Sequence, residues 1–438
     1  MSSEWPMQDL GSLISYRKGF AFKSKDYISS GVPIVRVSNF TDDSISPNDL
    51  KFVSPDVAKE TPEVSLEVND IVVATVGSWP NNPASVVGRT IRVPAWAESA
   101  LMNQNSVIIR AKSKSLTDQK FIYYQMRSQD FSAHVVSKAQ GSANQASITL
   151  DAIFSYRLFW PKVEHRDVIV TFLSHLDDRI TLLRETNTTL EAIAQGLFKS
   201  WFVDFDPVYA RARGEQPPGL APEVAALFPD SFEESELGMV PKGWKFGHIY
   251  DAATVIYGAP FASKRFNTER KGLPLIRIRD LKNETPGVYT DEVHPKGYLT
   301  QPGDIVVGMD GEFRAYLWGG QPAWLNQRVC VFKPISGHSS AFIHYTIKPQ
   351  LAAVEATEIA TTVIHLGKND IDRFSALIPD VGVIRAFSDV ANPFYAQIIE
   401  NKQKAQTLAN LRDTLLPRLI SGQLRLPDTE QQLKDLAV

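Results

Sequence analysis

Residues 165–207 read HRDVIVTFLSHLDDRITLLRETNTTLEAIAQGLFKSWFVDFDP, and this run decides how the rest of the chain is organised. Its apolar residues recur in alternating steps of four and three, which is a heptad seam with one polar position, Asn187. No proline or glycine interrupts the seam before Gly196, so the run predicts one helix about 50 Å long. A seam of that length needs a partner, because alone it would stay exposed to water. The seam consists of Ile169, Leu173, Leu176, Ile180, Leu183, Asn187, Leu190, Ala194, Leu197 and Trp201.

The bulk composition is that of a globular protein, with 43% hydrophobic and 22% charged residues in a chain of 438. At about 150 residues per domain, this length predicts two or three domains. Cys330 is the single cysteine, so no internal disulfide can form and a reducing compartment is expected. The N-terminal stretch lacks a signal-peptide pattern and the chain has no apolar run of about 20 residues, so we expect a cytoplasmic protein without a membrane partner. Because the net charge is −3, any binding of nucleic acid must come from local patches.

Self-comparison shows that the chain contains two copies of one pattern. The offset between matched residues falls from 239–241 at the start to 218 at the end, so the second copy is shorter in its middle. Each copy predicts a mixed α/β globule followed by a long helix. The predicted strands are residues 32–37, 70–76 and 106–110 in the first copy, and residues 273–278, 303–308 and 328–333 in the second. Matched positions include Trp5 with Trp244, Gly19 with Gly258, Pro33 with Pro274, residues 70–73 with 304–307, Asn103 with Asn326 and Pro161 with Pro379.

Residues 383–424 carry the second seam, in which Pro417 predicts a kink or break near the end. An antiparallel pairing that places Asn187 opposite Asn401 matches large side chains with small ones in several layers. Facing asparagines are expected to fix the register at some cost in stability. The alternative is two amphipathic helices, each packed on its own globule. The positions that define the predicted register are Leu183, Asn187, Leu190, Ile398, Asn401 and Ala405.

Several stretches resemble the specificity subunits of type I restriction–modification systems. The segment GLFKSWFVDFDPV at 196–208 resembles the central conserved region of that family, and LRDTLLPRLISGQLRL at 411–426 resembles its distal conserved region. GFAFKSKDY at 19–27 and NDIVVATVG at 69–77 resemble the scaffold of its target-recognition domains. The resemblance covers essentially the whole chain and its order.

The resemblance implies a non-catalytic subunit without a cofactor. Each target-recognition domain would read one half of a bipartite, gapped and asymmetric sequence in double-stranded DNA. The paired helices would set the spacer length and dock two methyltransferase subunits, which recruit motor–nuclease subunits. On this basis residues 1–164 form target-recognition domain 1, 165–205 the central conserved long helix, 206–243 an ordered linker, 244–382 target-recognition domain 2, 383–425 the distal conserved long helix and 426–438 a C-terminal tail.

Motifs of catalysis are missing from the sequence. It contains neither a G-x-x-x-x-G-K-[ST] loop nor an Asn/Asp-Pro-Pro-aromatic tetrad, and its eight histidines lack metal-site spacing, so we expect no cofactor and no metal. The histidines of the first long helix, His165 and His175, are expected to be solvated. The acidic residues Asp177, Asp178, Asp204 and Asp206 suggest either a metal cluster or, as we favour, a solvated helix face followed by a turn. The aromatic residues Phe198, Trp201, Phe202 and Phe205 are expected to be core between helix and second globule.

Candidates for DNA contacts are polar residues in the loops of the globules. Amides and hydroxyls suit base edges, while basic residues suit phosphates, although each could equally be an ordinary exposed side chain. The middle loops differ completely between the copies, which predicts two different half-sites. In the first globule the candidates are Lys23, Lys25, Arg36, Ser78, Trp79, Asn81, Asn82, Arg89, Lys138, Ser142, Asn144 and Gln145. In the second they are Lys264, Arg265, Arg277, Arg314, Tyr316, Trp318, Thr361, Thr362 and Lys368.

Two other functions stay open at this point. A fused methyltransferase would need a cofactor-binding loop, which the sequence lacks. A coiled-coil scaffold or adaptor that binds proteins and not DNA would need only the helices and the globules.

Overall fold

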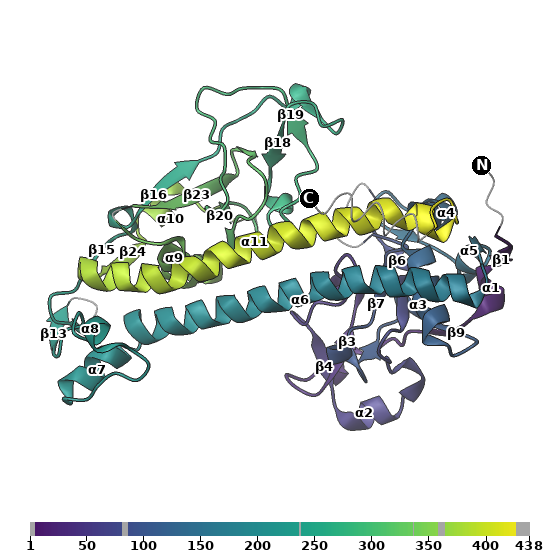
Figure 1. Ribbon diagram of the computed structural model, residues 1–438, viewed down its shortest axis with the longest axis horizontal. Coiled ribbons are helices and arrows are strands. Elements are labelled where there is room, and N and C mark those ends of the chain that lie inside the picture. The colour runs from purple at the N-terminus through teal and green to yellow at the C-terminus, as the bar shows by residue number, and fades with distance from the viewer. Residues whose placement is uncertain (1–4, 81–85, 236–237, 336, 358–363, 426–438) are drawn as a thin grey trace. The chain divides into compact units, whose positions relative to one another are not determined.

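A computed structural model describes residues 5–80, 86–235, 238–335, 337–357 and 364–425 (Figure 1). The chain divides into two compact units: unit 1 is residues 1–178 with 409–438, and unit 2 is residues 179–408. Each unit contains a mixed α/β globule and parts of two 40-residue helices, α6 (Val163–Phe202) and α11 (Val381–Ile420), which both cross the boundary. Among the helices in the described ranges, none is long and apolar enough to cross a membrane.

Unit 1 is built on a four-stranded antiparallel sheet with the order β2-β9-β5-β7. Its strands are β2 (Ile14–Lys18), β9 (Ser106–Ala111), β5 (Ile71–Ala74) and β7 (Thr90–Arg92). A second sheet, β4-β3-β8, comprises Lys51–Val53, Val32–Val35 and Leu101–Met102. A third, β10-β11-β6, comprises Gln140–Gly141, Ala146–Ser147 and Val76–Gly77, and β1 (Met7–Asp9) pairs with β12 (Arg157–Phe159). The α-helices of the globule are α1 (Leu10–Leu13), α2 (Pro55–Lys59), α3 (Leu116–Met126), α4 (Gln129–Ser137) and α5 (Leu150–Phe154).

Unit 2 contains the corresponding four-stranded antiparallel sheet, with the order β16-β23-β20-β21. Its strands are β16 (Ala253–Tyr257), β23 (Val329–Pro334), β20 (Ile305–Gly308) and β21 (Ala315–Leu317). The sheet β17-β19-β18-β22 comprises Phe266–Asn267, Tyr289–Thr290, Leu273–Ile276 and Trp324–Leu325. The strands β15 (Lys245–His248) and β24 (Ser375–Ile378) also pair, and the helices of this globule are α9 (Ser340–Thr357) and α10 (Lys368–Ile371).

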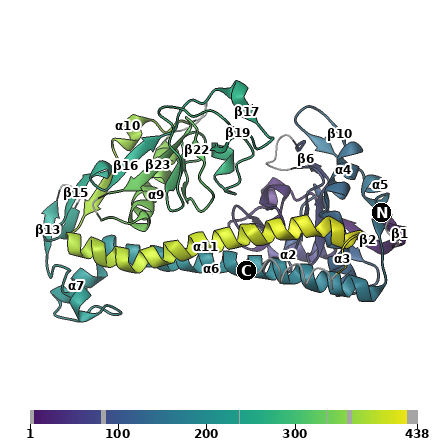
Figure 2. The same cartoon turned by 45° about the horizontal axis from the view of Figure 1, so that its top comes forward.

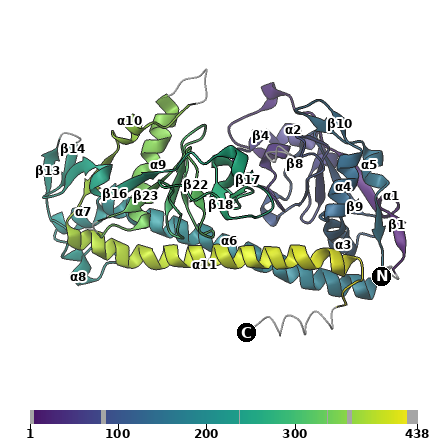
Figure 3. The same cartoon turned by 90° about the horizontal axis from the view of Figure 1, so that it is seen from above.

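The two globules therefore share one topology, which confirms the predicted internal repeat. In both, a Val- and Ile-rich central strand (β5, β20) is completely buried. In both, one helix (α3, α9) packs on the main sheet and is hydrogen-bonded to α6, through Tyr124 and Asp177 in unit 1 and through Tyr345 and the Glu191 carbonyl in unit 2 (Figures 2 and 3). The same backbone crossing recurs as well, since an ideal Cβ on Gly19 would lie 1.9 Å from the Asn103 carbonyl oxygen and one on Gly258 would lie 2.0 Å from that of Asn326. No larger side chain fits there, which explains why glycine stands at this point in each copy.

Within each unit the long helices run antiparallel. In unit 2, Asn187 contacts Asn401, whereas Trp201, which comes later in α6, contacts Phe387, which comes earlier in α11. The amide Nδ2 of Asn401 donates to Oδ1 of Asn187 at 2.9 Å, and Nδ2 of Asn187 donates to the Ile398 carbonyl at 3.2 Å. The antiparallel pairing predicted from the seams is confirmed. α11 continues past Pro417 to Ile420, so the proline does not break the helix.

The aromatic residues at the end of α6 form core, as predicted. Phe198, Trp201 and Phe202 are buried and contact Phe387 of α11 with ring centroids 5.1–6.1 Å apart. Phe202 also packs edge-on against Phe342 of α9 at 5.1 Å. Such ring pairs stabilise beyond the area they bury, so this cluster attaches the globule of unit 2 to its helices.

The segment 206–243 has more structure than the sequence predicts. It contains two short helices, α7 (Asp206–Ala212) and α8 (Pro222–Ala225), and a hairpin of β13 (Phe232–Ser235) and β14 (Gly238–Pro241). Pro207 stands in the first turn of α7, where its missing N–H is tolerated, and Phe205 precedes it at φ +56°. The buried side chains of Val208, Phe228 and Val240 join the core of unit 2.

One interpretation of the helix surface is wrong. Asp177 was expected on a solvated face, but it is buried in unit 1. Its carboxylate accepts a 2.7 Å hydrogen bond from the Tyr124 hydroxyl and forms a 2.7 Å ion pair with Arg412 of α11. Burial of a carboxylate is tolerated here because both oxygens have donors. By contrast, Asp178, His165 and His175 are exposed.

Candidate nucleic-acid interface

Two of the loops predicted to contact DNA lie side by side in unit 1. The small sheet β10-β11-β6 brings residues 76–77 beside residues 140–147. The indole Nε1 of Trp79 donates to the Ser142 carbonyl at 2.7 Å, and the Ser142 N–H donates to the Gln145 carbonyl at 2.9 Å. Ser142, Asn144 and Gln145 are exposed on this tight turn. The turn therefore presents two side-chain amides and a hydroxyl on a fixed backbone, a donor and acceptor set that can match base edges.

The other candidates of that region differ in solvent exposure and in their protein partners. Lys138 is exposed at the end of α4 and its Nζ donates to Ser155 at 2.6 Å. Ser78 is buried, and Arg89 is half-buried with a protein partner. Asn81 and Asn82 lie outside the described residues. Of this group, Lys138 is the cation best placed to meet a phosphate.

The paired basic residues of the two copies fall into two kinds. Lys23 and Lys25 of unit 1, at the 3₁₀ turn Ser24–Asp26, and Lys264 of unit 2, at Ser263–Arg265, are exposed. In contrast, the guanidinium of Arg36 donates to the Asp49 carbonyl at 2.8 Å, and that of Arg277 lies 3.1 Å from Asp280. These two arginines are held by partners in their own loops, so they are less available to phosphates than the exposed lysines.

In unit 2 the stretch from Arg314 to Trp318 is only partly available. Trp318 is fully buried and its Nε1 donates to the Gln321 carbonyl at 3.2 Å, so its assignment as a DNA contact is wrong. Tyr316 is half-buried on β21, and burial raises the pKa of its hydroxyl. Arg314 is exposed and ion-paired with Glu355 of α9, whose hydrogen bond raises the pKa of the guanidinium.

Two further candidates of unit 2, Arg265 and Lys368, are exposed and ion-paired. Arg265 lies 2.8 Å from Asp291, and this contact lowers the pKa of the Asp291 carboxyl. Lys368 of α10 lies 2.8 Å from Asp372. Exposed pairs of this kind are weak and exchange readily for a phosphate. Thr361 and Thr362 lie outside the described residues.

A charged cluster in unit 2 was missed by sequence reasoning. His365 Nδ1 lies 2.7 Å from Asp310 Oδ1, and the guanidinium of Arg328 lies 3.5 Å from the same oxygen. Asp310 bridges to His365 just beyond β20, as residues 76–77 pair with residues 146–147 beyond β5, so the cluster lies at the matching edge of the globule. Arg328 directly follows the Asn-Gln pair that is repeated at 103–104, and this repeat could have singled it out.

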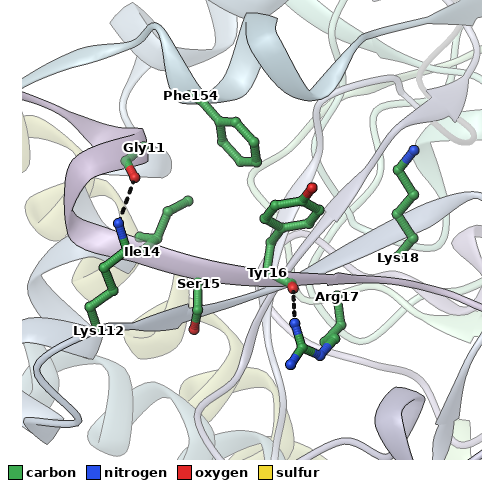
Figure 4. Close-up of a pocket in the computed structure, with 8 residues that line it drawn as sticks. All are labelled: Gly11, Ile14, Ser15, Tyr16, Arg17, Lys18, Lys112 and Phe154. Atoms are coloured by element: carbon green, nitrogen blue, oxygen red, sulfur yellow. Dashed lines mark hydrogen bonds between the residues drawn. The ribbon is translucent and has the colours of Figure 1, made fainter.

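A shallow pocket of about 500 Å³ lies along the edge strand β2 of unit 1 (Figure 4). The rings of Tyr16 and Phe154 pack at 4.9 Å over it, with Lys18 on the same side of the strand. The Nζ atom of Lys112 donates to the carbonyls of Gly11 and Ser12 at 3.1 and 3.0 Å. Phe154 is half-buried, whereas Tyr16 is exposed. An exposed aromatic ring beside a cation suits stacking with a base or contact with a phosphate.

No cluster of metal-ligating side chains stands out within the described ranges. Taken together, two α/β globules of one topology, each with a different polar edge and each packed on antiparallel helices, define an internally repeated α/β protein. Residues 2–192 and 241–409 match the family described as Type I restriction modification DNA specificity domain. The chain belongs to this family, as the resemblance in its sequence indicates.

Among curated relatives, the specificity subunit of the type I restriction enzyme EcoBI from Escherichia coli is 32% identical over 184 residues, which is 41% of this chain and 39% of that protein. The HindI specificity subunit of Haemophilus influenzae is 25% identical over 63% of this chain and 71% of its own length. The MjaIX specificity subunit of Methanocaldococcus jannaschii is 23% identical over 70% of each chain. The solved S subunit of a type I system from M. genitalium superposes with a TM-score of 0.49 at 14% identity, covering 95% of this chain and 96% of its own.

Proposed function

We propose that this chain is the sequence-specific DNA-recognition subunit of a type I restriction–modification complex. Each globule reads one half of a bipartite, gapped and asymmetric target in double-stranded DNA. The proposed modules are residues 1–164 and 244–382 for recognition and 165–205 and 383–425 for the helices, with 206–243 as a linker and 426–438 as a tail.

One observation carries the proposal: equivalent edges of the same fold present different chemistry. At the edge of unit 1 the turn 142–145 offers amides and a hydroxyl beside Trp79. At the corresponding edge of unit 2, Arg328, Asp310 and His365 present a cation, a carboxylate and an imidazole. Base pairs are distinguished by the donor and acceptor patterns at their edges. A protein that reads two different base sequences therefore needs two different sets of polar side chains, and here one scaffold carries both.

The partners follow from family membership. We propose that two methyltransferase subunits dock on the long helices and that motor–nuclease subunits join through them, all in the cytoplasm. This chain itself is non-catalytic and uses no cofactor. Its contribution is to place the methyltransferases at a chosen site, with phosphate contacts from local cations such as Lys23, Lys25 and Lys138 because the whole chain carries a net charge of −3.

Binding to DNA with and without the methyltransferase partner tests the proposal. A gel-shift assay on genomic duplex fragments should show selective retention by the complex, and the double variant Asn144→Ala, Gln145→Ala should lose about tenfold or more of the specific affinity while keeping the non-specific affinity. Gln216→Ala, which removes an exposed amide of the linker, is the control and should bind normally. A protein that binds the partner but never retains DNA selectively would instead be the protein-binding scaffold.

A further inference from the structure

An acidic residue stands at the same point of the loop after β3 and β18, the equivalent strands of the two globules. The stretches 33–44 and 274–285 align without a gap at an offset of 241, which matches Asp43 with Glu284. The start of both loops is fixed alike, since the Arg36 N–H donates to the Asn39 side chain at 3.0 Å and the Arg277 N–H donates to that of Asp280 at 2.9 Å. Each carboxylate is therefore held at a defined place in its globule.

In unit 2 this carboxylate is tied to the long helix α11. Lys402 Nζ donates to Glu284 Oε1 at 2.6 Å and to the Leu317 carbonyl at 2.7 Å. The other oxygen, Oε2, accepts the Gly319 N–H at 3.2 Å, and Gln403 Nε2 donates to the Gly319 carbonyl at 3.1 Å. A Cβ on Gly319 would lie 2.8 Å from Cδ of Lys402, so a larger residue there would displace the lysine side chain.

In unit 1 the matching carboxylate faces α11 as well. Asp43 Oδ2 lies 3.7 Å from Arg412 NH1 and 3.9 Å from Arg127 NH1. Arg412 in turn pairs with Asp177 of α6 at 2.7 Å, so the loop is linked through one guanidinium to both long helices. The Asp43 carbonyl accepts the Arg92 N–H at 3.2 Å, which holds the loop on β7.

These contacts are far less exposed than an ordinary helix-surface pair. The side chains of Glu284 and Lys402 are 14% and 27% exposed, and those of Asp43 and Arg412 are 16% and 5% exposed. Two positions to either side of Lys402 on α11, Glu400 and Lys404 form a 2.6 Å pair whose side chains are 56% and 53% exposed. A partly buried pair with several hydrogen bonds resists rearrangement, whereas an exposed one contributes little.

We propose that Glu284–Lys402 and Asp43–Arg412 are positioning contacts that fix the angle of each recognition globule on its helices and thereby limit the spacer lengths the protein accepts. This inference rests on the proposed function. Helix length is expected to set the mean spacer under the proposed function, and the loop–helix ion pairs set how far each globule can swing about its attachment to the helices of its own unit. Neither pair reads bases, so the half-site sequences do not depend on them.

The test measures which spacers are methylated by the reconstituted complex that contains the full chain. Glu284→Gln keeps the shape of the side chain and removes the charge, and Lys402→Met keeps the stem that packs on Gly319. For each variant, the methylation rate is compared on duplexes carrying both half-sites with the native spacer or with a spacer one base pair longer or shorter. Glu400→Gln is the matched control on the same helix.

We expect both variants to keep the half-sites and to lower the preference for the native spacer by about tenfold, because loss of one partner of a buried pair shifts an orientation equilibrium by at least that factor. Asp43→Asn should have the same effect from unit 1, and Glu400→Gln should have none. If the ion pairs only stabilise the fold, methylation should slow equally on all duplexes, and the ratio of rates between the native and the altered spacers should stay unchanged. That result in either folded variant overturns the inference. A changed half-site with an unchanged spacer preference also overturns it. A wild-type complex without any two-part target would instead refute the proposed function.

Discussion

Replacing the buried asparagines between the long helices of unit 2 should give strongly non-additive changes in stability. Asn187→Leu removes the 2.9 Å bond from Asn401 and the 3.2 Å bond to the Ile398 carbonyl, and leaves the Asn401 amide buried without that acceptor. The Asn401 carbonyl oxygen keeps the 2.9 Å bond from Gln397. Asn401→Leu in turn leaves Oδ1 of Asn187 without its donor. An orphaned buried donor or acceptor costs about 1–3 kcal/mol, so we expect each single Asn→Leu variant to lose about 2 kcal/mol of the free energy of unfolding.

The double variant Asn187→Leu, Asn401→Leu should recover most of this loss, because both polar partners are then apolar and Leu suits a heptad seam. The coupling energy between the two positions should therefore exceed about 1 kcal/mol. Urea unfolding followed by circular dichroism measures the midpoints of all four proteins, with Gln195→Leu on the exposed face of α6 as control. If the losses of the single variants simply add in the double variant, the pair does not act as one buried unit and the reasoning fails.

Three further results are expected. Four residues inserted after Ala192 lengthen α6 by about 6 Å and just over one turn, so methylation mapping should show unchanged half-sites with a spacer longer by about one or two base pairs. Exchange of residues 1–164 for those of a relative should alter one half-site and leave the other intact. Burial lowers the pKa of His344 to about 4 from its usual 6.5, so its neutral form stabilises the fold above about pH 6.5 and this contribution is lost as the pH falls toward 4. Calorimetry at a series of pH values measures the free energy of unfolding. Between pH 6.5 and 4 this free energy should fall by up to about 3 kcal/mol more in the wild type than in His344→Gln.

The regular parts of the fold were predictable because they follow from periodicity. The repeated heptads placed Asn187 opposite Asn401, and the four-and-three spacing of Phe198, Trp201 and Phe202 marked one buried face. Both patterns depend only on helix geometry. The strand cores, rich in Val and Ile, were equally clear from sequence, although their order in the sheets required the three-dimensional structure.

The errors arise where distant partners decide the environment of a side chain. Asp177 looks like a solvated helix residue until Tyr124 and Arg412, from 53 residues before and 235 residues after it, supply its donors. Trp318 follows a polar stretch and resembles an exposed loop aromatic, yet a carbonyl three residues later accepts its N–H in the interior. Helix α7 was missed because its proline reads as a helix breaker when its place in the first turn is unknown.

The central claim is that two globules of one fold read two different half-sites across an unread gap. The most direct measurement is a map of all methylated bases in the host genome before and after loss of this chain. We predict a motif of two unlike parts separated by a fixed spacer, present only when the chain is present. A contiguous motif, or a methylation pattern that does not change when the chain is lost, would contradict the account.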